Sequence, residues 1–199
     1  MVERVVVAVV GDSISAGSPL WDPDPAVRAG IDRADEHSQW QWWAAAQDSC
    51  LEFRTRAVYG KRTDEIAAFL DDVVDGADAL VVQGGINDVA QGRSVVDAAR
   101  DLAGIVERGR GLGLPVALAD VLPWPNGDAR AAAEIVRLNE LLHAIHGVTH
   151  LPFHDTLARM QSWSDDGDHP SVEGHRLLGE RAFRLPDQGR REPRSRRPD

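Results

Sequence analysis

The chain has 199 residues, a formal net charge of −10 and 43% hydrophobic residues, a composition typical of a globular protein with one domain. The acidic balance argues against a nucleic-acid surface, and no segment reaches the roughly 20 apolar residues of a membrane span. Cys50 is the single cysteine, so no internal disulfide can form, and the N-terminal apolar run is too short for a secretory signal. We expect a cytoplasmic protein without nucleic-acid or membrane partners.

An apolar, mostly β-branched run at residues 5–10 opens the chain and ends abruptly in Gly11-Asp12-Ser13. Such a run predicts a strand buried on both faces, as in the centre of a parallel sheet. Ser13 then follows the carboxyl end of the strand, which is the edge where ligands bind in open α/β sheets. Taken alone, the segment favours a plain turn in which Asp12 and Ser13 bond nearby backbone groups.

The rest of the chain alternates between predicted helices and strands. A proline-rich loop or lid is expected at 18–36, beside Ser13. Helices are expected at 38–50, at 63–74 with Thr63 as its N-cap, at 94–110, at 129–145 and from Ser171, and strands at 51–58, 79–83, 115–119 and 148–153. This alternation predicts an α/β fold, a three-layer α/β/α sandwich around a parallel sheet of about five strands. We expect one domain over residues 1–185 and a disordered, arginine-rich tail over 186–199.

Polar residues follow several of the predicted strands at one edge of the sheet. Ser13, Gly60 and Asn87 each come after a strand, and Asp166 and His169 lie together in the loop before the last helix. A serine hydroxyl is a weak nucleophile and needs an adjacent base, which is usually a histidine oriented by a carboxylate. Backbone N–H groups and an asparagine amide are suitable donors to a tetrahedral oxyanion. The pattern therefore predicts nucleophilic catalysis at this edge.

Four blocks, in their order and spacing, resemble the SGNH (GDSL) hydrolase family: residues 11–14, Gly60, residues 85–88 and residues 166–170. The resemblance implies a flavodoxin-like fold and a serine esterase or acylhydrolase without metal or cofactor. It also implies Ser13 as nucleophile, His169 as general base and Asp166 as the acid that orients it. The Ser13 N–H, the Gly60 N–H and the Asn87 side chain match the oxyanion hole. The block around Gly60 lacks the upstream asparagine and glycine often found there, so Gly60 is assigned by its place after the second strand.

Several polar residues leave alternatives open. Asp165 and Asp168 accompany Asp166 in the acidic loop, and only the spacing to His169 favours Asp166. His154 and Asp155 form the one rival acid–base pair. Asp12 and Asp88 are interpreted as residues that brace the turns around them.

Three segments are predicted to form the pocket walls: the proline-rich loop at 18–36, residues 123–125 and residues 160–163. Each carries one tryptophan, and Trp21, Trp124 and Trp163 are the expected substrate-binding residues. Trp40, Trp42 and Trp43 lie at helical spacing and are expected to pack instead. We expect a small-molecule or carbohydrate ester with a short acyl group such as acetyl. An acyltransferase using the same serine is the nearest alternative, and a non-catalytic ligand-binding module on the same scaffold is a more distant one.

Overall fold

The computed structural model describes residues 4–183 and contains one parallel sheet of five strands. The strands are β1 (Val5–Gly11), β2 (Leu51–Ala57), β3 (Ala79–Val82), β4 (Val116–Ala119) and β5 (Thr149–Leu151). They lie side by side in the order β2-β1-β3-β4-β5, and every neighbouring pair is parallel. This order is that of the flavodoxin-like doubly wound folds.

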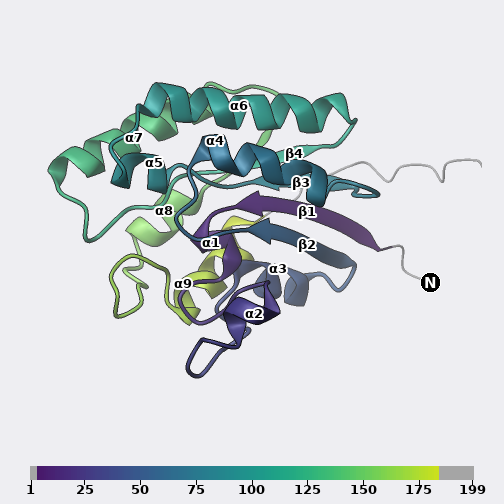
Figure 1. Ribbon diagram of the computed structural model, residues 1–199, viewed down its shortest axis with the longest axis horizontal. Coiled ribbons are helices and arrows are strands. Elements are labelled where there is room, and N and C mark those ends of the chain that lie inside the picture. Colours follow the sequence, from purple (N-terminus) through teal and green to yellow (C-terminus); the bar gives the residue numbers. More distant parts are fainter. Residues whose placement is uncertain (1–3, 184–199) are drawn as a thin grey trace, which may run out of the picture.

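Helices cover both faces of the sheet, as Figure 1 shows. The longer ones are α3 (Trp40–Gln47), α6 (Val95–Gly111) and α7 (Ala129–His143). The shorter ones are α1 (Ser13–Ala16), α2 (Pro25–Arg28), α4 (Thr63–Ile66) with a 3-10 turn at Ala67–Asp72, α5 (Ile86–Ala90), α8 (Phe153–Ala158) and α9 (Val172–Leu177) with a π turn at Leu178–Ala182. None of the helices within residues 4–183 is long and apolar enough to cross a membrane.

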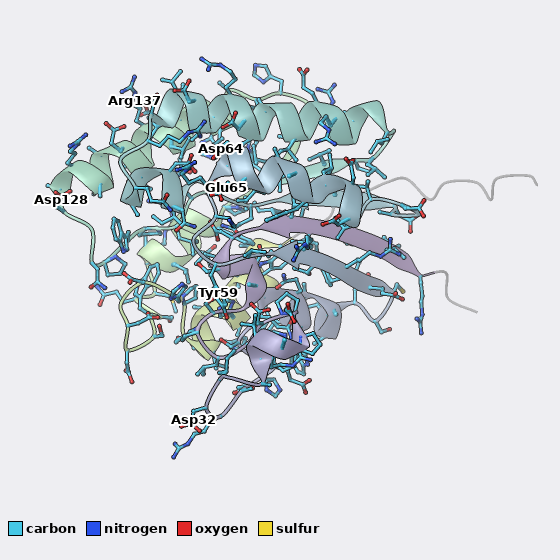
Figure 2. The ribbon with its side chains drawn as sticks, viewed as in Figure 1. Asp32, Tyr59, Asp64, Glu65, Asp128 and Arg137 are labelled. Carbon is cyan, nitrogen blue, oxygen red and sulfur yellow. The ribbon has the colours of Figure 1, made fainter. Side chains whose placement is uncertain are left out.

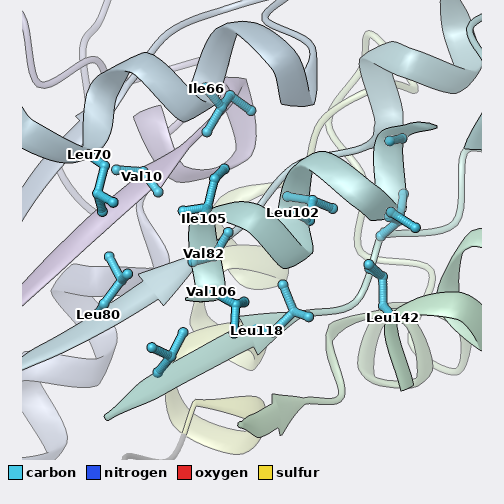
Figure 3. Close-up of a cluster of buried hydrophobic side chains, with 14 of the residues drawn as sticks. Val10, Ile66, Leu70, Leu80, Val82, Leu102, Ile105, Val106, Leu118 and Leu142 are labelled. Atoms are coloured by element: carbon cyan, nitrogen blue, oxygen red, sulfur yellow. The ribbon is translucent and has the colours of Figure 1, made fainter. Parts of the chain in front are cut away.

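The three layers follow from the alternation of side chains along the strands. Ala8 and Val10 of β1 pack against α4, α6 and α7 in one core cluster, which Figure 3 shows. Val7 and Val9 point to the opposite face and pack with α3, α8 and α9 in a second cluster. Because both faces of β1 are covered, its continuous apolar run is explained without a polar face.

The predicted fold class is therefore confirmed, and most of the predicted elements lie within a few residues of the observed ones. The proline-rich segment contains the short helix α2, with Asp24 as its N-cap. The expectation that Thr63 is the N-cap of α4 was wrong. Arg62 is the N-cap of α4 and Thr63 is its first residue, and the Thr63 hydroxyl donates a hydrogen bond to Asp88. The predicted tail at 186–199, and the domain boundary at 185, lie outside the described residues.

The strand order determines where a site can form. The connection from β1 to β2 runs to one side of β1, and the later strands are added on the other side. The loops that leave the carboxyl ends of β1 and β3 consequently diverge and leave room between them, which is the usual ligand position in doubly wound sheets. Ser13 follows β1 at this point, and Asn87 follows β3.

Candidate active site

The Gly11-Asp12-Ser13 segment turns the chain sharply from β1 into α1. Asp12 is the N-cap of α1, and its Oδ1 accepts a hydrogen bond from the Ile14 N–H at 3.0 Å. A Cβ at Gly11 would lie 2.7 Å from the Gln83 Oε1 and 2.9 Å from the Ser15 Cβ, so any other residue there would force its neighbours to shift. Ser13 becomes the first residue of the helix and is 6% exposed. The turn that Gly11 and Asp12 form therefore also places Ser13 at the carboxyl edge of the sheet.

The loop before α9 brings a histidine to this serine from 156 residues away. His169 Nε2 lies 3.0 Å from the Ser13 Oγ. His169 Nδ1 lies 2.7 Å from the Asp166 Oδ2. The three side chains form one hydrogen-bonded chain from carboxylate to imidazole to hydroxyl, which is the geometry that nucleophilic serine chemistry requires.

Asp166 is held by several donors besides the imidazole. Its Oδ1 accepts hydrogen bonds from the N–H groups of Asp168 and His169, at 2.9 and 3.0 Å, and from the Ser164 hydroxyl. Partial burial alone would raise the pKa of Asp166, but these bonds and the one from His169 outweigh it and hold the pKa below its usual range. Asp166 therefore remains a carboxylate wherever the rest of the site is folded.

The other acidic residues of this loop do not contact the imidazole. Asp168 Oδ1 accepts from the Trp124 Nε1 at 2.7 Å and from the Asn126 Nδ2 at 2.9 Å. Asp165 is exposed. The structure thus pairs His169 with Asp166, the residue that the spacing favours.

The proposed oxyanion donors come from the turn at Ser13, from the loop at Gly60 and from α5. Asn87 lies in the first turn of α5, and its Nδ2 donates to the Lys61 carbonyl at 3.1 Å. An asparagine amide has two N–H groups, so one of them is left for a ligand. Gly60 is exposed, with a φ of 69° in the left-handed region. The Ser13 N–H belongs to the first turn of a helix, where N–H groups have no intrahelical partner.

Asp12 and Asp88 are both fully buried and brace their surroundings, in agreement with the sequence interpretation. Asp88 accepts from the Thr63 N–H and hydroxyl, each at 3.0 Å, and forms an ion pair with Arg93. Burial raises the pKa of Asp12 to about 6, although its bonds to Ile14 and Gln83 oppose the rise. Asp12 Oδ2 has no hydrogen-bond partner among the described residues.

The three tryptophans that were expected to bind substrate have different surroundings. Trp21 is half-buried, with the Arg28 guanidinium stacked 4.3 Å from its ring centre. Trp124 is half-buried and donates to Asp168, so it touches the loop that carries His169. Trp163 is half-buried, packs against the α3, α8 and α9 core cluster and pairs with Pro170. Their contact with substrate stays a prediction. By contrast, Trp40 is fully buried among aromatic rings, as expected.

The rival acid–base pair is weaker in geometry. His154 Nδ1 lies 3.5 Å from Asp155 Oδ1, against 2.7 Å for the His169–Asp166 pair. Both residues lie in α8, and within residues 4–183 no hydroxyl is bonded to either ring nitrogen of His154. The described residues also contain no group of three or more His, Cys, Asp or Glu side chains arranged to hold a metal ion.

Sequence reasoning missed the residues that hold the site in place. Ser164 and Asn126 hold the Asp166–His169 loop, and Gln91 donates to the Gly60 carbonyl at 2.9 Å. Asn126 lies 40 residues from Asp166, and Gln91 lies 31 residues from Gly60. No local pattern marks Asn126 or Gln91, because their role exists only once the loops meet. Ser164 lies two residues before Asp166, so the local sequence could have indicated its bond to that carboxylate.

Comparison with known protein families finds a match over most of the chain. A sequence profile described as the GDSL-like lipase/acylhydrolase family matches residues 9–177. The chain belongs to this family. It thereby joins hydrolytic enzymes of the GDSL type, and the matched range contains every proposed site residue from Ser13 to His169. A comparison with curated protein sequences finds no match.

Solved structures share the fold. A member of the lipolytic G-D-S-L family from Veillonella parvula superposes with a TM-score of 0.72 at 18% identity, covering 88% of this chain and 94% of that one. AlinE4, an SGNH-hydrolase family esterase, gives 0.63 at 23% identity, with 87% and 90% covered. The psychrotrophic esterase EstA from Pseudoalteromonas, in a structure inhibited by monoethylphosphonate, gives 0.63 at 16% identity, with 87% and 92% covered.

Proposed function

We propose that this chain is a serine esterase that hydrolyses a carboxylic ester with a short acyl group, such as acetyl, through an acyl-enzyme on Ser13. One observation carries the proposal: the Ser13 Oγ, His169 and Asp166 form a continuous hydrogen-bonded chain, with distances of 3.0 and 2.7 Å. Membership of the GDSL-like lipase/acylhydrolase family supports the same class of chemistry.

The mechanism follows from the roles these groups can take. Ser13 Oγ attacks the ester carbonyl carbon while His169 Nε2 accepts the hydroxyl proton, and Asp166 holds the ring through Nδ1. The carbonyl oxygen becomes an oxyanion that the N–H groups of Ser13 and Gly60 and the Asn87 amide stabilise. The C–O bond to the alcohol then breaks, and His169 gives its proton to the leaving alcohol. Water, activated by His169, attacks the acyl-enzyme and releases the acid and free Ser13.

Burial and shape favour a small acyl group and a polar alcohol. Ser13 is 6% exposed, and such limited access to the nucleophile supports a short acyl group. A hollow of about 410 Å³ lies between residues 22–27 and the end of β2, and Tyr59, which lines it, directly precedes Gly60. Its lining includes the Asp22 carboxylate and Arg56, which suit hydroxyl groups. We assign the alcohol part of the ester, for example a carbohydrate, to this side.

The test is covalent labelling combined with hydrolysis. The wild-type protein should react with a fluorophosphonate probe at Ser13 and hydrolyse p-nitrophenyl acetate faster than the octanoate. Ser13→Ala should abolish labelling and reduce kcat/KM by about 1,000-fold or more, because the nucleophile is lost. Ser49→Ala, in the exposed turn before β2, is the control and should behave as wild type. Ser164 is not suitable for this purpose because its hydroxyl donates to Asp166. A Ser13→Ala variant that retains full activity would overturn the proposal.

A further inference from the structure

The side chains of α5 and the turn after it hold the loop that carries Gly60. Gln91 Nε2 donates to the Gly60 carbonyl at 2.9 Å, and Asn87 Nδ2 donates to the next carbonyl, that of Lys61, at 3.1 Å. Two successive peptide groups of the loop are therefore held by two side chains one helical turn apart.

An ion-pair network around the buried Asp88 links α5 to this loop. Asp88, with no exposed surface, accepts from the N–H and the hydroxyl of Thr63 and from Arg93. Arg93 also reaches Asp101 of α6 at 2.7 Å, which anchors the network to the long helix. Breaking a buried pair of this kind is costly, so α5 is a rigid support. Figure 2 labels Asp64 and Glu65 at the start of α4, the segment that this network holds.

Gly60 is the third residue of a turn that is closed by a long bond, from the Lys61 N–H to the Val58 carbonyl at 3.4 Å. Its φ is 69°, and no atom lies within 4 Å of the position that a Cβ would take. A glycine in such a place rotates freely unless its peptide groups are bonded. On one side Tyr59, labelled in Figure 2, donates its hydroxyl to the Trp21 carbonyl at 3.1 Å. On the other side the Gly60 carbonyl is bonded to Gln91. The Gln91 bond restrains the Gly60–Lys61 peptide directly, and the Tyr59 bond anchors the side chain of the residue that precedes the Gly60 N–H.

We propose that Gln91 is a positioning residue of the oxyanion hole, which orients Gly60 so that its N–H points to the developing oxyanion. The role rests on the proposed esterase function of Ser13. An oxyanion donor stabilises the transition state only if it is aimed before the charge develops. Without the Gln91 bond the Gly60 peptide samples other orientations, and part of the stabilisation is lost with no change in ground-state binding.

Gln91 is exposed, so its replacement tests this role without threatening the fold. Gln91→Leu keeps the size and removes the donor, and Gln91→Lys retains a donor on a flexible stem. Gln47→Leu is the matched control, an exposed glutamine at the end of α3. Three properties are measured for each variant: kcat/KM for p-nitrophenyl acetate, Tm, and the inhibition constants of two ketones. A short trifluoromethyl ketone forms an oxyanion on the serine, and the matching unfluorinated ketone reports ground-state binding.

Gln91→Leu should lower kcat/KM by about 5- to 30-fold, less than the roughly 100- to 1,000-fold expected for removal of a whole donor. The affinity for the trifluoromethyl ketone should fall by a similar factor, while the unfluorinated ketone and Tm remain as in the wild type. Gln91→Lys should recover most of the loss, and Gln47→Leu should match the wild type.

Two results would overturn the proposal. Equal kcat/KM and trifluoromethyl ketone affinity in Gln91→Leu and wild type would remove the role of Gln91 while leaving the esterase function intact. A parallel fall in both ketone affinities and in Tm would make Gln91 merely structural. If the wild type neither labels at Ser13 nor hydrolyses esters, the esterase function fails first and this role fails with it.

Discussion

Asp12 is a carboxylic acid without exposed surface, placed directly before the proposed nucleophile. One oxygen caps α1 through the Ile14 N–H, and the other has no partner among the described residues. Desolvation of the charged form raises the pKa of Asp12 from 3.8 to about 6. Folding therefore favours the protonated acid. This stabilising contribution is fully present below about pH 4 and is lost as the pH rises through about 6.

Asp12→Asn should remove this pH dependence, because the amide is neutral throughout. Between about pH 4 and pH 7 the wild type should lose up to about 3 kcal/mol of unfolding free energy relative to the variant. Urea denaturation at several pH values measures the difference, and a constant offset from the substitution does not affect it. Asp165→Asn, at an exposed position, is the control. Parallel stability curves for wild type and Asp12→Asn would contradict the burial argument.

At the scale of elements, the site depends on two loops that hold each other. The loop after β4 supplies Trp124 and Asn126, and both donate to Asp168 in the loop that carries His169. Asn126 also donates to the Asp166 carbonyl at 2.8 Å. Since α7, β5 and α8 separate these loops in sequence, the bonds fix how the imidazole approaches Ser13.

Asp168→Ala should lower kcat/KM by about 3- to 30-fold, because a small misplacement of a catalytic group slows the reaction strongly. The pH dependence of activity should keep its shape, since the His169–Asp166 pair remains. Steady-state kinetics on p-nitrophenyl acetate measures the effect. Asp165→Ala in the same loop is exposed and should behave as wild type. Equal loss in both variants would instead indicate a general effect of charge in the loop.

At the scale of the whole molecule, the layers pack closely enough to require glycine between helices. The turn after α9 packs against α3, and a Cβ at Gly179 would lie 2.6 Å from the Trp43 Cβ and closer still to the Trp40 carbonyl. Both the backbone and a tryptophan side chain would have to move. This contact joins the last described helix to the second core cluster, to which Trp40 belongs.

Gly179→Ala should lower the free energy of unfolding by about 1–3 kcal/mol through overpacking. The matched control is Gly104→Ala in α6, where no atom lies within 4 Å of the Cβ position. That substitution should stabilise the protein by about 0.5–1 kcal/mol, because alanine is the better helix former. Thermal or urea unfolding compares the two. A destabilised Gly104→Ala, or a neutral Gly179→Ala, would contradict the packing argument.

Long elements with a clear period could be predicted from the sequence, and short ones could not. The run at 5–10 and the apolar stripe of α7 each extend over enough residues to define a face. The helices α1, α5 and α8 have four to six residues, too few for a period. Thr63 was misplaced as an N-cap because its hydroxyl has a better partner, Asp88, 25 residues away.

The sequence by itself determined that Gly11-Asp12-Ser13 ends a strand buried on both faces and that Asp166 and His169 share one short loop. It did so because strand burial and a three-residue spacing are local properties. Tertiary structure alone decided that His169 reaches Ser13, that Asp168 turns to Trp124 and Asn126, and that Gln91 holds Gly60. Those contacts span 31 or more residues in each case, and a hydrogen bond depends on where the folded layers bring its two ends rather than on the residues beside either one.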